Sequence, residues 1–235
     1  MRLIAALLLT AALASYFWFV RGHGIGWPRR DAPWRPSRRF ERMAARTLAL
    51  FGLVSVIVLM LAGRGDAPWR FPPEFLEAQA ALGGPIGNLS MGYVALGIGA
   101  GALIGALASR LTGRRFEFGT IDAVLPRGRA ELGWGVVMSL VAGVAEEAYF
   151  RLALPLLLTL ATGSATFAFA MSLALFAAAH RYQGWKGVAA TLVAGGAITW
   201  AYLVTGSLWS AMALHVLVDL NGLVVRPVLT GRVRL

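Results

Sequence analysis

Long runs of apolar residues, separated by shorter polar connections, dominate the pattern of this 235-residue chain. A helix needs about 20 predominantly apolar residues to span the hydrocarbon core of a bilayer. The pattern therefore predicts an all-α fold, a polytopic transmembrane bundle of about seven to eight helices. The stretches that reach or approach this length are roughly 3–20, 44–62, 89–109, 132–160, 164–180, 187–205 and 207–226.

The fourth stretch, residues 132–160, is too long for one perpendicular span. About 29 residues at a rise of about 1.5 Å each exceed a hydrocarbon core about 30 Å thick, so this segment must tilt, break or split. Pro155 is the expected break, because its ring removes the backbone hydrogen bond that would reach back to the carbonyl of Arg151.

Composition agrees with a membrane protein. The chain is 58% hydrophobic and 14% charged, whereas roughly a quarter of the residues of a soluble domain are charged. The net charge of +11 comes from arginine clusters between apolar runs, which favours anionic lipid headgroups as partners and not nucleic acid. Cysteine is absent, which excludes disulfides and thiol catalysis. Without a repeat or soluble appendage, residues 1–235 are expected to form a single integral membrane domain, whose oligomeric state the sequence leaves open.

Arginines concentrate in alternate connections, and this predicts the orientation. Residues 21–43, 110–131 and 181–186 and the C-terminal tail carry most of the basic residues, and all four lie on one side of a seven-helix bundle. Cytoplasmic loops retain positive charge, so we expect the N-terminus outside and the C-terminus inside, in a bacterial cytoplasmic (inner) membrane. The alternative for the first stretch is a signal peptide cleaved near residues 12–14, which would move the basic 21–43 connection outside.

Charged residues inside the apolar stretches need a separate explanation. Each costs about 2.5–3.5 kcal/mol at the bilayer centre on insertion scales, so such residues usually face protein or water and act there. Glu146, Glu147 and Arg151 lie in the fourth stretch. Glu147 and Arg151 are one helical turn apart, which predicts an ion pair. Glu146 is rotated by about 100° from Glu147, so one carboxylate is neutralised while the other stays available.

Two of the three histidines also lie in apolar stretches. His180 ends the fifth stretch, one turn after Phe176, and His215 lies in the seventh, one turn before Asp219. Carboxylates and imidazoles together supply the base, the proton carrier and the oxyanion partner that hydrolysis requires. The same residues also fit a non-catalytic scaffold, in which the cluster only fixes helix packing, or the proton relay of a transporter.

The three motifs resemble those of the CAAX protease and bacteriocin-processing (CPBP) membrane proteins, which include the type II CAAX prenyl endopeptidases. The motif E-E-x-x-x-R stands at residues 146–151, F-x-x-x-H at 176–180 and H-x-x-x-N/D at 215–219. Their order along the chain matches as well, so residues 131–220 are the expected catalytic core. The first 130 residues are similar only as generic membrane helices.

The resemblance implies an intramembrane endopeptidase that hydrolyses a peptide bond of a membrane-associated substrate in a cavity open to the cytoplasm. A role in bacteriocin maturation or self-immunity is also implied. The implied roles are an activating pair for water, Glu146 and His180; an oxyanion pair, His215 and Asp219; and three supporting residues, Glu147, Arg151 and Phe176.

Two questions about chemistry stay open at this point. The eukaryotic prenyl endopeptidases carry Asn at the position of Asp219, and an ionised Asp cannot donate to an oxyanion, so Asp219 must be protonated or must orient His215. Members of the family have also been described as metalloproteases, and Glu146, His180 and His215 would then be the zinc ligands. We favour the mechanism that requires no cofactor, because Arg151 is expected to occupy one carboxylate.

Overall fold

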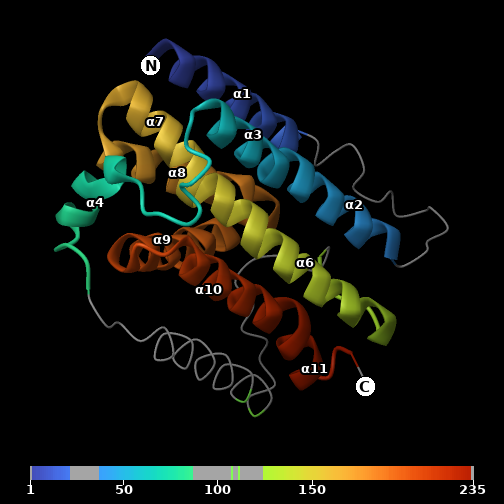
Figure 1. The fold of residues 1–235 in the computed structure, drawn as a ribbon. Helices are drawn as coiled ribbons and strands as arrows, with labels where there is room; N and C mark the ends of the chain where they lie inside the picture. The colour runs from blue at the N-terminus through green and yellow to red at the C-terminus, as the bar shows by residue number, and fades with distance from the viewer. Residues whose placement is uncertain (1, 22–36, 87–106, 108–110, 112–123, 234–235) are drawn as a thin grey trace.

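The computed structural model describes residues 2–21, 37–86 and 124–233, together with the single residues 107 and 111. Within these residues the regular secondary structure is entirely helical (Figure 1). The predicted span 89–109 lies outside them, apart from residue 107. The all-α membrane bundle predicted from the hydrophobic pattern is confirmed.

Four helical stretches are long and apolar enough to cross a membrane, and a fifth, α8 (Ala165–Ala179), is shorter and also apolar. Their outward-facing side chains include large apolar residues such as Leu3, Trp18 and Met60, as expected for surfaces in contact with lipid. The chain is therefore an integral membrane protein. The four long stretches are Arg2–Arg21, Arg38–Leu61, Arg181–Thr205 and Leu208–Leu229.

The elements follow one another as two groups on either side of a central helix. The first group is α1 (Arg2–Arg21), α2 (Ser37–Thr47), the π-helical turn η2 (Leu48–Leu53), α3 (Val54–Leu61), the 3-10 turn η3 (Pro73–Phe75) and α4 (Leu76–Ala81). The central helix comprises α6 (Arg129–Glu147), the π-helical turn η4 (Ala148–Ala153) and α7 (Leu154–Thr162). The second group is α8, the 3-10 turn η5 (Arg181–Gln183), α9 (Gly184–Thr205), α10 (Leu208–Leu220), η6 (Asn221–Val225) and α11 (Arg226–Leu229).

The central helix corrects the expectation of a break at Pro155. Its three parts, of 19, 6 and 9 residues, are continuous, and Figure 1 shows them as one long helix across the molecule. Pro155 lies in the first turn of α7, directly after the π-helical turn. The wider turn accommodates the proline ring and its missing N–H without ending the helix.

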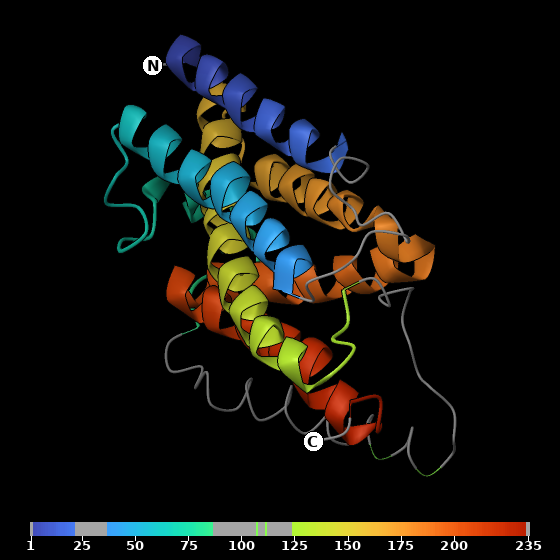
Figure 2. The same ribbon diagram turned by 90° about the vertical axis from the view of Figure 1, so that its right-hand side faces the viewer.

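Packing surrounds this central helix on both sides. Helix α1 packs on α7, α2 and α10 pack on α6, and α8 packs on α7 and α9. Figure 1 shows α1–α3 on one side of the central helix and α9 and α10 on the other, with α8 behind it, and Figure 2 shows α8 from the side. Because α6 and η4 contact both groups, their side chains occupy the middle of the bundle, where a buried site can form.

Helix α1 is an integral part of this core. The Tyr149 hydroxyl donates to the Ala12 carbonyl at 2.5 Å, and the Tyr16 hydroxyl donates to the Leu175 carbonyl at 2.9 Å. Each such bond between buried groups contributes about 1 kcal/mol. Cleavage near residues 12–14, the alternative considered from the sequence, would remove Ala12 and with it the first of these contacts, and would leave Tyr16 next to the new N-terminus.

Two connections in the second group use the same tripeptide, Thr-Gly-Ser. Gly163 and Gly206 end α7 and α9 in the left-handed region, with φ of 86° and 66°. The next residues, Ser164 and Ser207, cap α8 and α10 by accepting from backbone N–H groups. A glycine stop followed by a serine cap produces a tight reversal between helices.

Helix α2 begins earlier than the predicted span 44–62. Arg38, Arg39 and Arg42, placed by the sequence in the 21–43 connection, belong to this helix. Arg39 is buried because it pairs with Glu131 of α6 and donates to the Leu125 carbonyl at 2.8 Å. The hydropathy of one segment does not show that Glu131 from another helix neutralises Arg39. The predicted start of the span at residue 44 was wrong for this reason.

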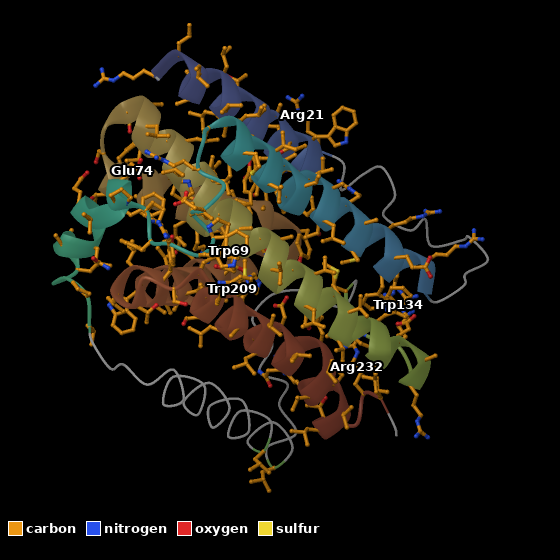
Figure 3. The ribbon with its side chains drawn as sticks, viewed as in Figure 1. Arg21, Trp69, Glu74, Trp134, Trp209 and Arg232 are labelled. Atoms are coloured by element: carbon orange, nitrogen blue, oxygen red, sulfur yellow. The ribbon has the colours of Figure 1, made fainter. Side chains whose placement is uncertain are left out.

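Tryptophans and arginines lie at several levels of the bundle. Figure 3 shows Trp134 and Arg232 toward one end of the bundle and Glu74 toward the other, with Trp69 and Trp209 between them. Trp69 is 72% exposed and Trp209 is 54% exposed. Exposed tryptophans near the end of a bundle are typical of a membrane–water interface.

Candidate active site

The first motif forms the predicted ion pair in the middle of the bundle. Arg151 Nη1 donates to Glu147 Oε1 at 2.8 Å, and the side chains of Glu147 and Arg151 are 0% and 1% exposed. Both residues lie where α6 passes into the π-helical turn. The spacing of one helical turn was enough to predict this contact.

The same carboxylate oxygen of Glu147 also binds His215. His215 Nδ1 lies 2.6 Å from Glu147 Oε1, so Nδ1 carries the hydrogen and the carboxylate accepts it. This bond fixes the orientation of the imidazole and joins α10 to α6. Spacing along the chain did not predict this contact, because the two residues are far apart in sequence and are brought together only by helix packing.

Arg151 has further partners that hold its guanidinium in place. Arg151 Nη2 donates to the Gly195 carbonyl at 3.1 Å, and the guanidinium carbon lies 4.2 Å from the centre of the Phe176 ring. Phe176 thus stabilises the buried cation through its π face. A Cβ atom on Gly195 would lie 2.9 Å from Phe176 Cδ1 and 3.1 Å from Arg151 Nη2, so this position requires glycine.

Asp219 lies near His215 without a hydrogen bond to it. Its Oδ2 atom is 3.7 Å from His215 Nε2, and its side chain is 28% exposed. That distance is beyond a hydrogen bond. Of the two carboxylates near His215, Glu147 is therefore the one that orients the ring.

Glu146 and His180 face open space. In the described part of the chain, no protein group forms a hydrogen bond with the Glu146 carboxylate, which lines two cavities of about 290 and 270 Å³ together with His180. His180 Nδ1 lies 2.9 Å from the Phe176 carbonyl. A carbonyl only accepts, so in the neutral ring the hydrogen is on Nδ1 and the lone pair is on Nε2.

The two cavities meet at the site but differ in their walls. The first lies between α1, α2 and the central helix and is lined largely by apolar residues, among them Phe19, Phe51 and Phe150, with Arg42 and Arg46 also on its wall. The second lies between α2, α6, α9 and α10 and includes His215 and Asp219. Both are lined by Met43, Met138, Glu146, His180 and Tyr182.

The residues do not form a metal site in this arrangement. Among the described residues, no three His, Asp or Glu side chains come together in a way that could hold a metal ion. Glu147 and His215 satisfy each other through Oε1 and Nδ1. The set Glu146, His180 and His215, considered as zinc ligands from the sequence, is therefore not assembled as a ligand cluster, and no step of the chemistry is assigned to a metal.

A helical membrane bundle with an internal Glu–Arg–His network and a cavity-facing Glu–His pair defines a membrane protein with an acid–base site in its core. Residues 128–221 match the family described as type II CAAX prenyl endopeptidase Rce1-like. All three motifs lie within the matched residues, so this part of the chain is similar to the CAAX protease (CPBP) family that the motifs indicated. The family supports a hydrolase of the CAAX protease type. Neither the curated proteins nor the solved structures provide a match.

Proposed function

We propose that the protein is an intramembrane endopeptidase that hydrolyses a peptide bond of a membrane-associated substrate. The observation that carries the proposal is that two adjacent carboxylates lie in different surroundings, one paired and buried and the other facing the cavities. Glu147 is fully buried and bound to Arg151 and His215, whereas Glu146 faces both cavities beside His180. A network that served only helix packing would not require the second carboxylate to face open space.

In the proposed reaction, Glu146 removes a proton from water while the water oxygen attacks the carbonyl carbon of the peptide bond. The C–O bond forms, and the π electrons of the carbonyl move to its oxygen. His180 shares the proton through Nε2, because its Nδ1 is bonded to the Phe176 carbonyl. When the tetrahedral intermediate collapses, the C–N bond breaks and the proton passes to the leaving nitrogen. His215, oriented by Glu147, faces the oxyanion side.

The proposed substrate is a peptide that reaches the site from the membrane. The first cavity, between α1, α2 and the central helix, has a largely apolar wall, which suits a lipid-modified or hydrophobic segment. A CAAX-type peptide is one candidate, and a bacteriocin precursor is another. We propose that the arginine-rich end is cytoplasmic, in a bacterial cytoplasmic membrane with the N-terminus outside and anionic lipid as the surrounding partner.

The test is cleavage in liposomes by the full-length protein. The probes are a farnesylated CAAX-type peptide and a set of membrane-anchored peptides, followed by mass spectrometry. Glu146→Gln and His180→Ala are each expected to lower kcat by about 10²–10⁴-fold, the usual contribution of a general acid or base. Asp66→Asn, an exposed carboxylate outside the site, is the matched control. Wild-type rates in folded Glu146→Gln protein would contradict the mechanism.

The zinc-dependent alternative has a direct test. Because the proposed chemistry uses only side chains and water, cleavage is expected to persist after dialysis against a strong chelator. Loss of cleavage with recovery on added zinc would instead support a metalloendopeptidase. A control with a zinc-dependent soluble protease in the same liposomes shows that the chelator acts under these conditions.

The non-catalytic alternative rests on the same buried network. Glu147, Arg151 and His215 join α6 and α10, which also suits a membrane scaffold or immunity protein. In that case Glu146→Gln would leave the biological effect of the protein unchanged. A proton-flux assay in the same liposomes tests the other alternative, that the protein is a proton-coupled transporter.

A further inference from the structure

The walls of the two cavities that meet at Glu146 differ in charge. Besides Glu146, the charged residues that line the first cavity are Arg42 and Arg46, both of α2. The second cavity is lined by the carboxylate of Asp219 and, among the described residues, by no arginine or lysine. A peptide that passes Glu146 from one cavity to the other therefore meets a basic wall on one side and an acidic wall on the other.

The two arginines project from the same face of α2. They are four residues apart, which is about one helical turn. Arg46 is held against α1, because its Nη2 donates to the Phe19 carbonyl at 3.0 Å and its guanidinium carbon lies 5.4 Å from the centre of the Phe19 ring. Arg42 is exposed, and in the described part of the chain no acidic side chain forms an ion pair with it. Arg42 thus presents a positive charge at the cavity wall.

The rest of the first cavity makes this charge selective. Its wall is largely apolar and includes the buried rings of Phe51 and Phe150. Opposite charges attract more strongly where apolar groups exclude part of the water, and a charge on the wall favours partners of the opposite sign over all others. In the second cavity, Asp219 and Glu146 repel an anion. The charges therefore favour one placement of an anionic peptide, with its negative group in the first cavity.

We infer that Arg42, assisted by the charge of Arg46, binds a carboxylate of the peptide substrate in the first cavity and so determines which peptides are cleaved. The inference rests on the proposed peptidase function and names its substrate class, hydrophobic membrane-associated peptides with a carboxylate near the scissile bond. The carboxylate belongs to an acidic side chain or to the end of the peptide, since a guanidinium binds both in the same way. Arg42 and Glu146 line one cavity of about 290 Å³, so only a few residues separate the carboxylate from the scissile bond.

The first test changes the charge of the peptide and leaves the protein unchanged. One membrane-anchored peptide is made with Glu or Gln next to the scissile bond, each with a terminal carboxylate or a carboxamide. The form with the bound carboxylate is expected to have a KM about tenfold lower than the uncharged form. The value of kcat should stay within about twofold, because the contact is made equally in ground and transition states. The four forms show which carboxylate is bound, and an equal KM for all four would overturn the inference.

The second test changes Arg42. In Arg42→Gln, KM for the preferred peptide is expected to rise about tenfold and KM for the uncharged peptide by less than about twofold. Arg38→Gln is the matched control, because Arg38 is exposed on the same helix and lines neither cavity. Arg42→Glu is expected to reverse the preference, toward a peptide with Lys in place of Glu. Equal losses for all peptides would show a structural role for Arg42 and would contradict the inference.

Anionic lipid is the competing ligand for an exposed arginine. The assays are therefore repeated in phosphatidylcholine liposomes with and without phosphatidylglycerol. If the loss in Arg42→Gln follows the charge of the lipid and not that of the peptide, Arg42 binds headgroups and the inference is wrong. If Glu146-dependent cleavage is the same for charged and uncharged peptides, only the carboxylate site fails. If no Glu146-dependent cleavage occurs, the proposed function fails as well.

Discussion

At the scale of single residues, the two adjacent glutamates are expected to differ in their contribution to the free energy of unfolding. Glu147 neutralises Arg151, which is 1% exposed, whereas Glu146 has no protein hydrogen bond in the described part of the chain. Removing one partner of a buried ion pair costs about 3–5 kcal/mol because the remaining charge is uncompensated. Glu147→Ala is therefore expected to lower the free energy of unfolding by about that amount, whereas Glu146→Gln leaves it unchanged or raises it.

Thermal unfolding in detergent, followed by the monomeric peak in size-exclusion chromatography, measures this difference. Equal losses in both variants would show that Glu146 is also part of the packing network. The activity assay then separates the residues further, because only Glu146→Gln combines a stable fold with a loss of kcat.

The adjacent glycines Gly195 and Gly196 provide a second matched pair. A Cβ on Gly195 would lie 2.9 Å from Phe176 Cδ1, whereas on Gly196 the nearest atom is Leu173 Cδ2 at 3.8 Å. Gly195→Ala is expected to destabilise by about 1–3 kcal/mol through overpacking. Gly196→Ala is expected to be neutral or stabilising by up to about 1 kcal/mol, since alanine favours the helix. Similar melting temperatures for both variants would contradict the close approach at Gly195.

The sequence predicted those contacts of the candidate site that form between residues of the same helix. The contact between Glu147 and Arg151 follows from helical spacing. The contacts of Glu147 with His215 and of Arg151 with Gly195 join residues from different helices, and no rule for a single segment gives them. Tyr182 lines both cavities but was not considered from the sequence, because it lies in a connecting turn outside the apolar stretches.

At the scale of elements, the start of α8 depends on a carboxylate from α4. Glu77 accepts from the Ala165 N–H at 2.9 Å and from the Ser164 hydroxyl at 3.0 Å. These bonds, the backbone bond first, hold the pKa of Glu77 below its ordinary value. Since α8 carries His180 at its other end, this cap supports the helix that positions the imidazole proposed to be catalytic.

The depressed pKa gives a pH dependence with a definite sign. A carboxyl group whose pKa is lower in the folded state stabilises the fold above its unfolded pKa, and this contribution is lost as the pH falls through the folded pKa. Glu77→Gln is therefore expected to melt below wild type at pH 7, and the difference should shrink below pH about 4. Glu41→Gln, an exposed residue of α2, is the control. A constant difference across this range would exclude the cap.

The elements themselves show where hydropathy succeeds and where it fails. The predicted stretches 187–205 and 207–226 correspond to the observed spans Arg181–Thr205 and Leu208–Leu229. The prediction of a break at Pro155 was wrong, because the π-helical turn before the proline accommodates its ring and the helix continues. Arg39 was placed outside its helix because its neutralising partner Glu131 comes from α6. Both predictions considered one segment at a time. The geometry of the preceding turn and a counter-charge from another helix could not be seen in that way.

At the scale of the whole molecule, the proposed orientation follows from the distribution of arginines, and the sequence makes it easy to test. The chain contains no cysteine, so each introduced cysteine is the only thiol. Asp66→Cys lies in the connection after α3, and Lys186→Cys lies at the start of α9; both side chains are exposed. With the N-terminus outside, these positions are expected on opposite faces of the membrane, with Asp66 outside.

Labelling of intact bacterial spheroplasts with a membrane-impermeant maleimide separates the two orientations. Asp66→Cys is expected to react before lysis and Lys186→Cys only after it. The reverse pattern would place the arginine-rich end outside and would move the proposed site to the other face. Labelling of both positions before lysis would mean that they share one face, which would contradict the seven-helix count because α9 would then begin on the side where α3 ends. The result therefore tests the number of crossings as well as their direction, including the predicted span 89–109.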